Sequence, residues 1–202
     1  MKQTKPSILE LRSLSPVFDT YSQVSAGKAD HMLTIRPEQR ADQEQVFHVN
    51  QLAFGQLDEA RLVEALRRSP AFIPELSLVA VEEERIVGHI LFSRVAVRHG
   101  TIAHEALSLA PMAVLPARQR SGIGSSLVKR GLADARQLGH RVVIVVGHPE
   151  YYPRFGFIPG EPLGIGPPFE VSPGAFMVLE LQPSALEGIR GEVEYPPEFG
   201  EF

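Results

Sequence analysis

The segment from Pro111 to Ala135, PMAVLPARQRSGIGSSLVKRGLADA, most constrains what this chain can fold into. It runs from an apolar, strand-like stretch, through a turn rich in arginine and glycine, into a helix that begins near Ile123. A strand that leads into a helix needs a sheet to join and a face for the helix to cover. The segment therefore predicts a layered fold that contains both helices and a sheet.

The hydrophobic pattern of the remaining chain supplies that sheet. Alternating or wholly apolar runs predict strands at 33–36, 76–81, 86–97, 105–114, 141–148 and 175–183. Helical periodicity and helix stop signals predict helices at 37–55, 58–69, 123–138 and 149–156. The order of these elements along the chain indicates an α+β fold with a mixed sheet and helices on its faces.

A chain of 202 residues fits one domain, which we expect to span 33–183. Residues 1–32 have little periodicity and no long apolar run, so we expect a flexible N-terminal extension without a secretory signal. Residues 184–202 are expected to form an acidic C-terminal tail. The Pro- and Gly-rich loop at 159–174 is long enough to carry specificity.

Composition excludes several classes of function. The net charge of −4 gives no basic footprint for nucleic acid or for an acidic membrane. The chain has no cysteine, which excludes disulfides, thiolate metal sites and a cysteine acyl-enzyme. Its seven histidines lack metal-ligand spacing, so no metal is expected. Together these features favour a cytoplasmic protein without a membrane span.

The turn RQRSGIGSS predicts a site for an anion. The first amides of a helix have no intrahelical partner, the helix dipole adds positive charge, and glycine lets an anion approach the backbone. A phosphate loop of ATPases would need Lys after Gly124, and a dinucleotide fingerprint would need a glycine or alanine at Leu127. A plain helix start, with glycines for close packing, is the alternative.

The context of this turn resembles a known family. Gln119 to Gly124 matches Q-x-x-G-x-G after a strand, EYYPRFGF resembles a Y-x-x-x-G-F segment, and VNQLAF resembles an opening helix. All three are similar to the GNAT superfamily of acyl-CoA-dependent N-acyltransferases, over about Leu33 to Pro183. The ending GIGPPFEVSPGAFMVLEL resembles a bacterial subgroup of predicted N-acetyltransferases.

The resemblance implies a GNAT-like, mostly antiparallel central sheet with helices on both faces and a splayed strand pair at the cofactor site. It implies acetyl-CoA as co-substrate, with pantetheine along a bulged strand and pyrophosphate in the glycine turn. The implied cofactor-binding residues are Met112, Ala113 and Val114 on the strand and Gln119, Arg120, Ser121, Gly122, Ile123, Gly124 and Ser125 in the turn.

The resemblance also implies catalytic residues. Tyr152 takes the place of the general acid that protonates the leaving thiolate, and Tyr151 takes it if the alignment shifts by one residue. A half-buried structural tyrosine is the alternative. Glu105, beside His104, is the candidate general base, although either could be a solvated edge residue. His148 and Glu150 follow the next strand and would border the acceptor cleft.

The predicted function is transfer of an acetyl group from acetyl-CoA to an amine, by direct attack in a ternary complex. A non-catalytic acyl-CoA-binding regulatory module on the same fold is the alternative, and Tyr152 favours the enzyme. A nucleic-acid-binding protein ranks third, because the net charge of the chain is negative. The expected partners are acetyl-CoA and an amine acceptor, and the chain could form a homodimer.

Overall fold

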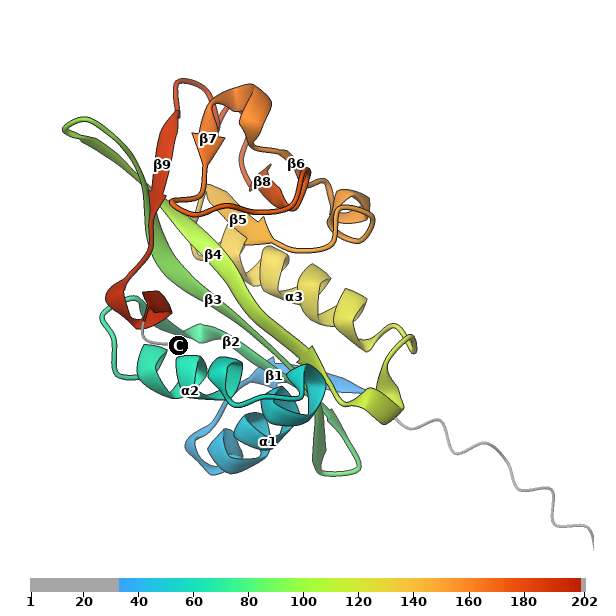
Figure 1. The fold of residues 1–202 in the computed structure, drawn as a ribbon. Helices are drawn as coiled ribbons and strands as arrows, with labels where there is room; N and C mark the ends of the chain where they lie inside the picture. Colours follow the sequence, from blue (N-terminus) through green and yellow to red (C-terminus); the bar gives the residue numbers. More distant parts are fainter. Residues whose placement is uncertain (1–32, 201–202) are drawn as a thin grey trace, which may run out of the picture. The chain divides into compact units, whose positions relative to one another are not determined.

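The structure is a computed structural model that describes residues 33–200, and the predicted extension at 1–32 lies outside this range. One sheet runs through the described residues in the order β1-β2-β3-β4-β5-β8-β6 (Figure 1). Its strands are β1 (Thr34–Pro37), β2 (Phe72–Glu82), β3 (Arg85–His99), β4 (Ile102–Val114), β5 (Val142–Val146), β6 (Ile158–Pro159) and β8 (Phe176–Glu180). Along this path only β4 and β5 are parallel, so the sheet is mostly antiparallel.

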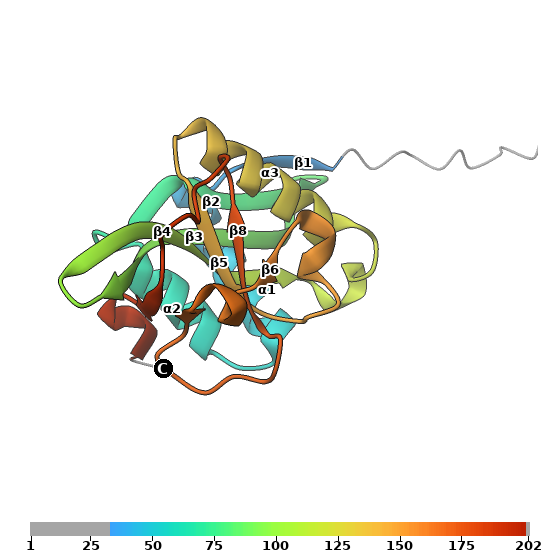
Figure 2. The ribbon, with the colours of Figure 1, turned by 90° about the horizontal axis from the view of Figure 1, so that it is seen from above.

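Helices cover both faces of the sheet, as Figure 2 shows. Helices α1 (Gln43–Phe54) and α2 (Asp58–Leu66) lie on one face, and α3 (Ile123–Gln137) lies on the other. The remaining helical turns are η1 (Arg40–Asp42), η2 (Pro116–Arg118), η3 (Tyr152–Phe155), η4 (Glu161–Leu163) and η5 (Pro197–Gly200). This arrangement confirms the predicted fold class. No helix between residues 33 and 200 is long and apolar enough to cross a membrane.

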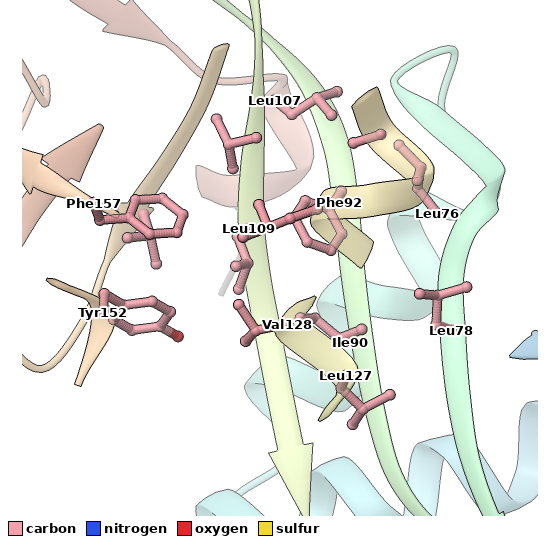
Figure 3. Packing of buried hydrophobic residues seen from close by; sticks show 14 of the residues in the cluster. Leu76, Leu78, Ile90, Phe92, Leu107, Leu109, Leu127, Val128, Tyr152 and Phe157 are labelled. Atoms are coloured by element: carbon pink, nitrogen blue, oxygen red, sulfur yellow. The ribbon is translucent and has the colours of Figure 1, made fainter. Parts of the chain in front are cut away.

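The core under α3 is apolar and closely packed. Leu127 and Val128 of α3 meet Ile90 and Phe92 of β3 and Leu109 of β4 (Figure 3). Close packing reaches the helix backbone, because a Cβ at Gly131 would lie 2.3 Å from the Phe92 ring. The strand–turn–helix segment of the sequence is therefore anchored on a rigid base, which fixes the position of its turn.

A buried polar chain lies on the opposite face, under α1 and α2. Asn50 donates to Nδ1 of the fully buried His89 at 3.1 Å, and His89 Nε2 lies 3.1 Å from Ser77 Oγ, which in turn donates to Glu38. Glu38 also pairs with Arg67 at 2.6 Å. Burial, and then the charge of Arg67, lowers the pKa of His89 to about 3, so the imidazole is neutral.

The C-terminal segment joins the sheet. Strand β9 (Gly191–Glu194) pairs antiparallel with β3 at Ala96–Arg98, just beyond the stretch of β3 that pairs with β2. It also pairs with β7 (Ile165–Gly166). Ala185, Ile189 and Val193 are buried in a second core cluster. Residues that the sequence sets apart as a tail thus contribute both a strand and core side chains.

Candidate active site

The expected bulge and splay are present in β4. Between the pairs Ile90–Met112 and Phe92–Leu109, β3 advances two residues and β4 advances three, so β4 carries one extra residue. Strand β5 pairs with β4 only at Leu107 and Ser108. Beyond Ser108 the two strands diverge, and the end of β4 has an edge that no β5 residue covers.

A cavity of about 580 Å³ lies where this free edge meets the start of α3. It is lined by Ala53, Phe54, Met112, Val114, Arg118, Gln119, Arg120, Gly122, Gly124, Ser125, His148, Tyr151, Tyr152 and Arg154. A larger cavity of about 760 Å³ lies by His99 and the loop at 186–191, and no residue of the glycine turn or of η3 lines it. The smaller cavity is therefore the one where the predicted chemistry converges.

The glycine turn has the backbone of an anion site. Gly122 caps α3 with a φ of 89°, Arg120 has a φ of 61°, and no side chain bonds the helix cap. The first intrahelical bond is made by Ser126, which donates to Gly122 O at 3.0 Å, so the amides before Ser126 lack a helical partner. When residues beside the N-terminus of a helix have a left-handed backbone conformation, they orient these unpaired amides toward one point.

The turn's two arginines differ in their electrostatic partners. Arg118 pairs with Glu82 at 2.5 Å, which fastens the turn to the end of β2. Arg120 is exposed, lines the cavity and makes no ion pair within residues 33–200. Arg120 is therefore the arginine of this turn that is free to meet an anion.

Seven of the ten predicted cofactor residues line the cavity: Met112, Val114, Gln119, Arg120, Gly122, Gly124 and Ser125. The other three do not. Ile123 is buried in the core under α3, Ala113 packs toward α1, and Ser121 donates to Arg118 O at 2.6 Å. The side chains of these three residues support the turn and the strand.

Tyr152, the first residue of η3, and Tyr151, its N-cap, both line the cavity but differ in burial. Tyr152 is 6% exposed, and its ring packs against Gly147 and lies 5.6 Å from Phe157 (Figure 3). Burial, and next the neighbouring Tyr151, raises the pKa of the Tyr152 hydroxyl, which stays protonated. Tyr151 is half-buried and meets the Tyr152 ring edge-on at 5.1 Å.

Glu105 is not brought to this cavity. It lies near the start of β4, 63% exposed, with Oε1 3.3 Å from Nδ1 of His140. Together with His104 it lines a separate cavity of about 350 Å³. His148 lines the cavity of about 580 Å³ beside the tyrosines, whereas Glu150 is exposed and does not.

Arg154 and the end of α1 line the cavity, although the sequence did not identify them as site residues. Arg154 lies two residues after Tyr152, and its positive charge within the Y-x-x-x-G-F segment was the signal that could have identified it. Ala53 and Phe54 end α1, which VNQLAF had already marked as an opening helix.

Comparison with known proteins decides the family. Residues 34–160 match the model of the acetyltransferase (GNAT) domain. This chain belongs to the GNAT family of acetyltransferases. It is 38% identical to the uncharacterized N-acetyltransferase YjhQ of Escherichia coli K12 over 64% of this chain and 71% of that protein. It is 33% identical to YhbS of the same strain over 71% of this chain and 84% of YhbS.

Solved GNAT structures show the same architecture. The crystal structure of Escherichia coli YhbS in complex with CoA aligns with a TM-score of 0.78 and 30% identity, covering 84% of this chain and 93% of that one. A GNAT acetyltransferase from Brucella melitensis in complex with acetyl-CoA aligns with a TM-score of 0.69 and 33% identity, covering 84% and 99%.

Proposed function

We propose that this GNAT protein transfers an acetyl group from acetyl-CoA to an amine by direct attack in a ternary complex. The observation that carries the proposal is the single cavity shared by the free edge of β4, the glycine turn and Tyr152. Relatives of this fold in complex with CoA and acetyl-CoA support the choice of co-substrate.

The free edge of β4 is suited to the pantetheine arm. Leu115 N donates to Val87 O of β3, and strand amides alternate in direction, so the amides of Met112 and Val114 face the open side. An extended arm with two amides can pair there as an added strand does. The amide of Val114 is also the proposed donor to the oxyanion of the tetrahedral intermediate.

The glycine turn is the proposed site of the diphosphate. Amides from Gly122 to Ser125 would bind its oxygens, and Arg120 would add a charge-assisted contact. Gln119 donates through Nε2 to Val114 O at 3.2 Å, which joins the turn to the strand that holds pantetheine.

The chemical step needs protons to leave nitrogen and one to reach sulfur. The neutral amine attacks the thioester carbonyl, nitrogen releases its extra proton from the tetrahedral intermediate, the C–S bond breaks, and Tyr152 donates a proton to the departing sulfur. The acceptor ammonium must first lose a proton, and His148 is the imidazole that lines the cavity. We therefore propose His148 for this second role in preference to Glu105, which lines another cavity.

A paired binding and turnover assay tests the proposal. Calorimetry should show acetyl-CoA binding, and release of free CoA thiol should accompany transfer to one member of a panel of amines, amino acids, aminoglycosides and peptide N-termini. Binding without turnover on every acceptor would favour the regulatory acyl-CoA-binding module instead. We also propose a cytoplasmic enzyme that can form a homodimer, which cell fractionation and light scattering would check.

A further inference from the structure

Tyr151 lies across the cavity from the glycine turn. Its hydroxyl is 3.0 Å from the point that a Cβ on Gly124 would occupy, and Met112 lies 3.7 Å from the same point. Tyr151 precedes η3, whereas Gly124 belongs to the first turn of α3, so two separate elements approach each other at the anion site. The hydroxyl of Tyr151 is thus directed at the start of α3.

Arg154 lies over one face of the same ring. Its guanidinium carbon is 3.9 Å from the Tyr151 ring centroid and 5.2 Å from that of Phe155. No carboxylate pairs with Arg154 in the described part of the chain, in contrast to Arg118 with Glu82. A guanidinium stacked on an aromatic ring has fewer conformations to lose when it binds an anion.

We propose that Tyr151 and Arg154 form a second wall of the diphosphate site, facing the amides of the glycine turn. The Tyr151 hydroxyl donates to a phosphate oxygen beside Gly124. Arg154, held by the ring, supplies the charge on the opposite side from Arg120. This inference rests on the proposed function and adds to it two binding residues that lie beside the catalytic tyrosine in sequence.

The two adjacent tyrosines then have separate roles. Tyr152 holds a proton for the reacting sulfur, whereas Tyr151 positions the far end of the same co-substrate. Changes at Tyr151 or Arg154 should raise Kd and KM for acetyl-CoA and leave kcat unchanged, since the lost contacts are equal in the ground and transition states. A merely structural role would not produce this division.

Three probes locate the contact by calorimetry: CoA, dephospho-CoA, which lacks the 3′-phosphate, and pantetheine, which lacks all phosphates. Arg154→Ala should weaken CoA and dephospho-CoA by the same factor, about tenfold for a lost charge-assisted contact, and leave pantetheine unchanged. A loss confined to CoA would assign Arg154 to the 3′-phosphate and overturn the proposal. Unchanged affinity for all three would also overturn it.

A double-mutant cycle tests the stacked pair. Tyr151→Leu should cost more affinity than Arg154→Ala, because it removes the hydroxyl contact as well as the support of the arginine, and the double variant should cost little more than Tyr151→Leu alone. Additive losses would contradict the pair. Tyr151→Phe keeps the ring and should weaken CoA only several-fold, the value of one neutral hydrogen bond. Arg154 is exposed, so its replacement tests the proposal even if Tyr151→Leu fails to fold.

Controls separate this proposal from the proposed function. Arg141→Ala removes an exposed arginine at the other end of β5 and should leave all affinities unchanged. If the unaltered protein binds no CoA, the proposed function itself fails. If it binds CoA normally and both Tyr151→Leu and Arg154→Ala do too, only the second wall is refuted.

Discussion

The two ends of β4 have opposite characters. At the Val114 end the strand leaves β5, opens a cavity and leads into a turn with left-handed residues. At the Ile102 end it stays paired with β3, and β9 extends the sheet along β3 at Ala96–Arg98. One strand thus joins an open end, where a cavity and a glycine turn leave backbone groups for a ligand, to a closed end, where β9 takes the place of β2 beside β3.

The support beneath each end differs as well. At the open end, His89 lies opposite Ala113 in the β3–β4 ladder and reaches Asn50 of α1, the helix whose last turn lines the cavity. At the closed end, Val97 of β3 and Val193 of β9 pack in an apolar cluster. We therefore expect changes at the open end to alter function and changes at the closed end to alter stability.

The largest expected effect is on turnover. Tyr152→Phe keeps the ring packed against Gly147 but removes the proton, so kcat should fall by about a hundred- to ten-thousandfold with little change in acetyl-CoA affinity. Initial-rate assays with an identified acceptor across the pH range measure kcat. Tyr151→Phe is the matched control and should keep kcat. A full kcat in Tyr152→Phe would make this tyrosine structural.

A second effect at the open end concerns binding. In Gly124→Val the added side chain meets the Tyr151 hydroxyl and covers the first amides of α3, so CoA affinity should fall about tenfold to a hundredfold. Calorimetry measures this, with circular dichroism to confirm folding. Gly166→Val is a suitable control, because a Cβ there meets no atom within 4 Å. Equal losses in both variants would mean that the effect is not local to the site.

The sequence predicted the open end better than the closed end, for physical reasons. The strand, glycine turn and helix from Pro111 to Ala135 each have a strong pattern, and their order fixes where the turn lies. β9 is four residues long with one buried apolar side chain, Val193, so its period of two is not visible. Its pairing depends on β3, which lies nearly a hundred residues earlier in the chain.

The position of Glu105 relative to the cavity depends on the length of β4, which a sequence motif does not display. A strand rises about 3.3 Å per residue, so Glu105 lies about 23 Å along β4 from Met112. The buried chain from Asn50 to Glu38 was not predicted either, since its members come from four separate elements or loops. Tyr151 and Tyr152, in contrast, were both identified, because one short motif positions them together.

The polar support of the open end should make stability depend on pH. His89 has a folded pKa of about 3, below the ordinary value near 6.5, so the unfolded chain binds a proton that the folded protein does not. Its stabilising contribution is complete above pH 6.5 and declines as the pH falls toward 3. Between pH 7 and 5 the loss should be about 2 kcal/mol. Urea unfolding of the unaltered protein and His89→Gln at both pH values should show a flatter dependence in the variant; equal slopes would refute the assignment.

At the closed end a core change should lower stability and leave the active site intact. Val193→Ala removes two buried methyl groups from the cluster that joins β9 to β3, which should cost about 1.6 kcal/mol of unfolding free energy. Thermal or urea unfolding measures this, and CoA affinity at a temperature where the variant is folded should equal that of the unaltered protein. An affinity loss comparable to that of Gly124→Val would show that the two ends are coupled.

The smallest expected effect is at Glu105, and it tests the division between the two ends most directly. Glu105→Gln keeps the size of a side chain that is 63% exposed and removes its charge next to His140. An exposed ion pair contributes little to stability, and the cavity by Glu105 shares no lining residue with the one that contains Tyr152. The kcat/KM profile against pH should therefore match that of the unaltered enzyme in height and in both limbs. His148→Ala is the informative companion, because loss of a base in the cavity should lower kcat/KM. If Glu105→Gln instead lowers kcat/KM, the acceptor must reach the closed end of β4, and the cavity at the open end holds only the co-substrate.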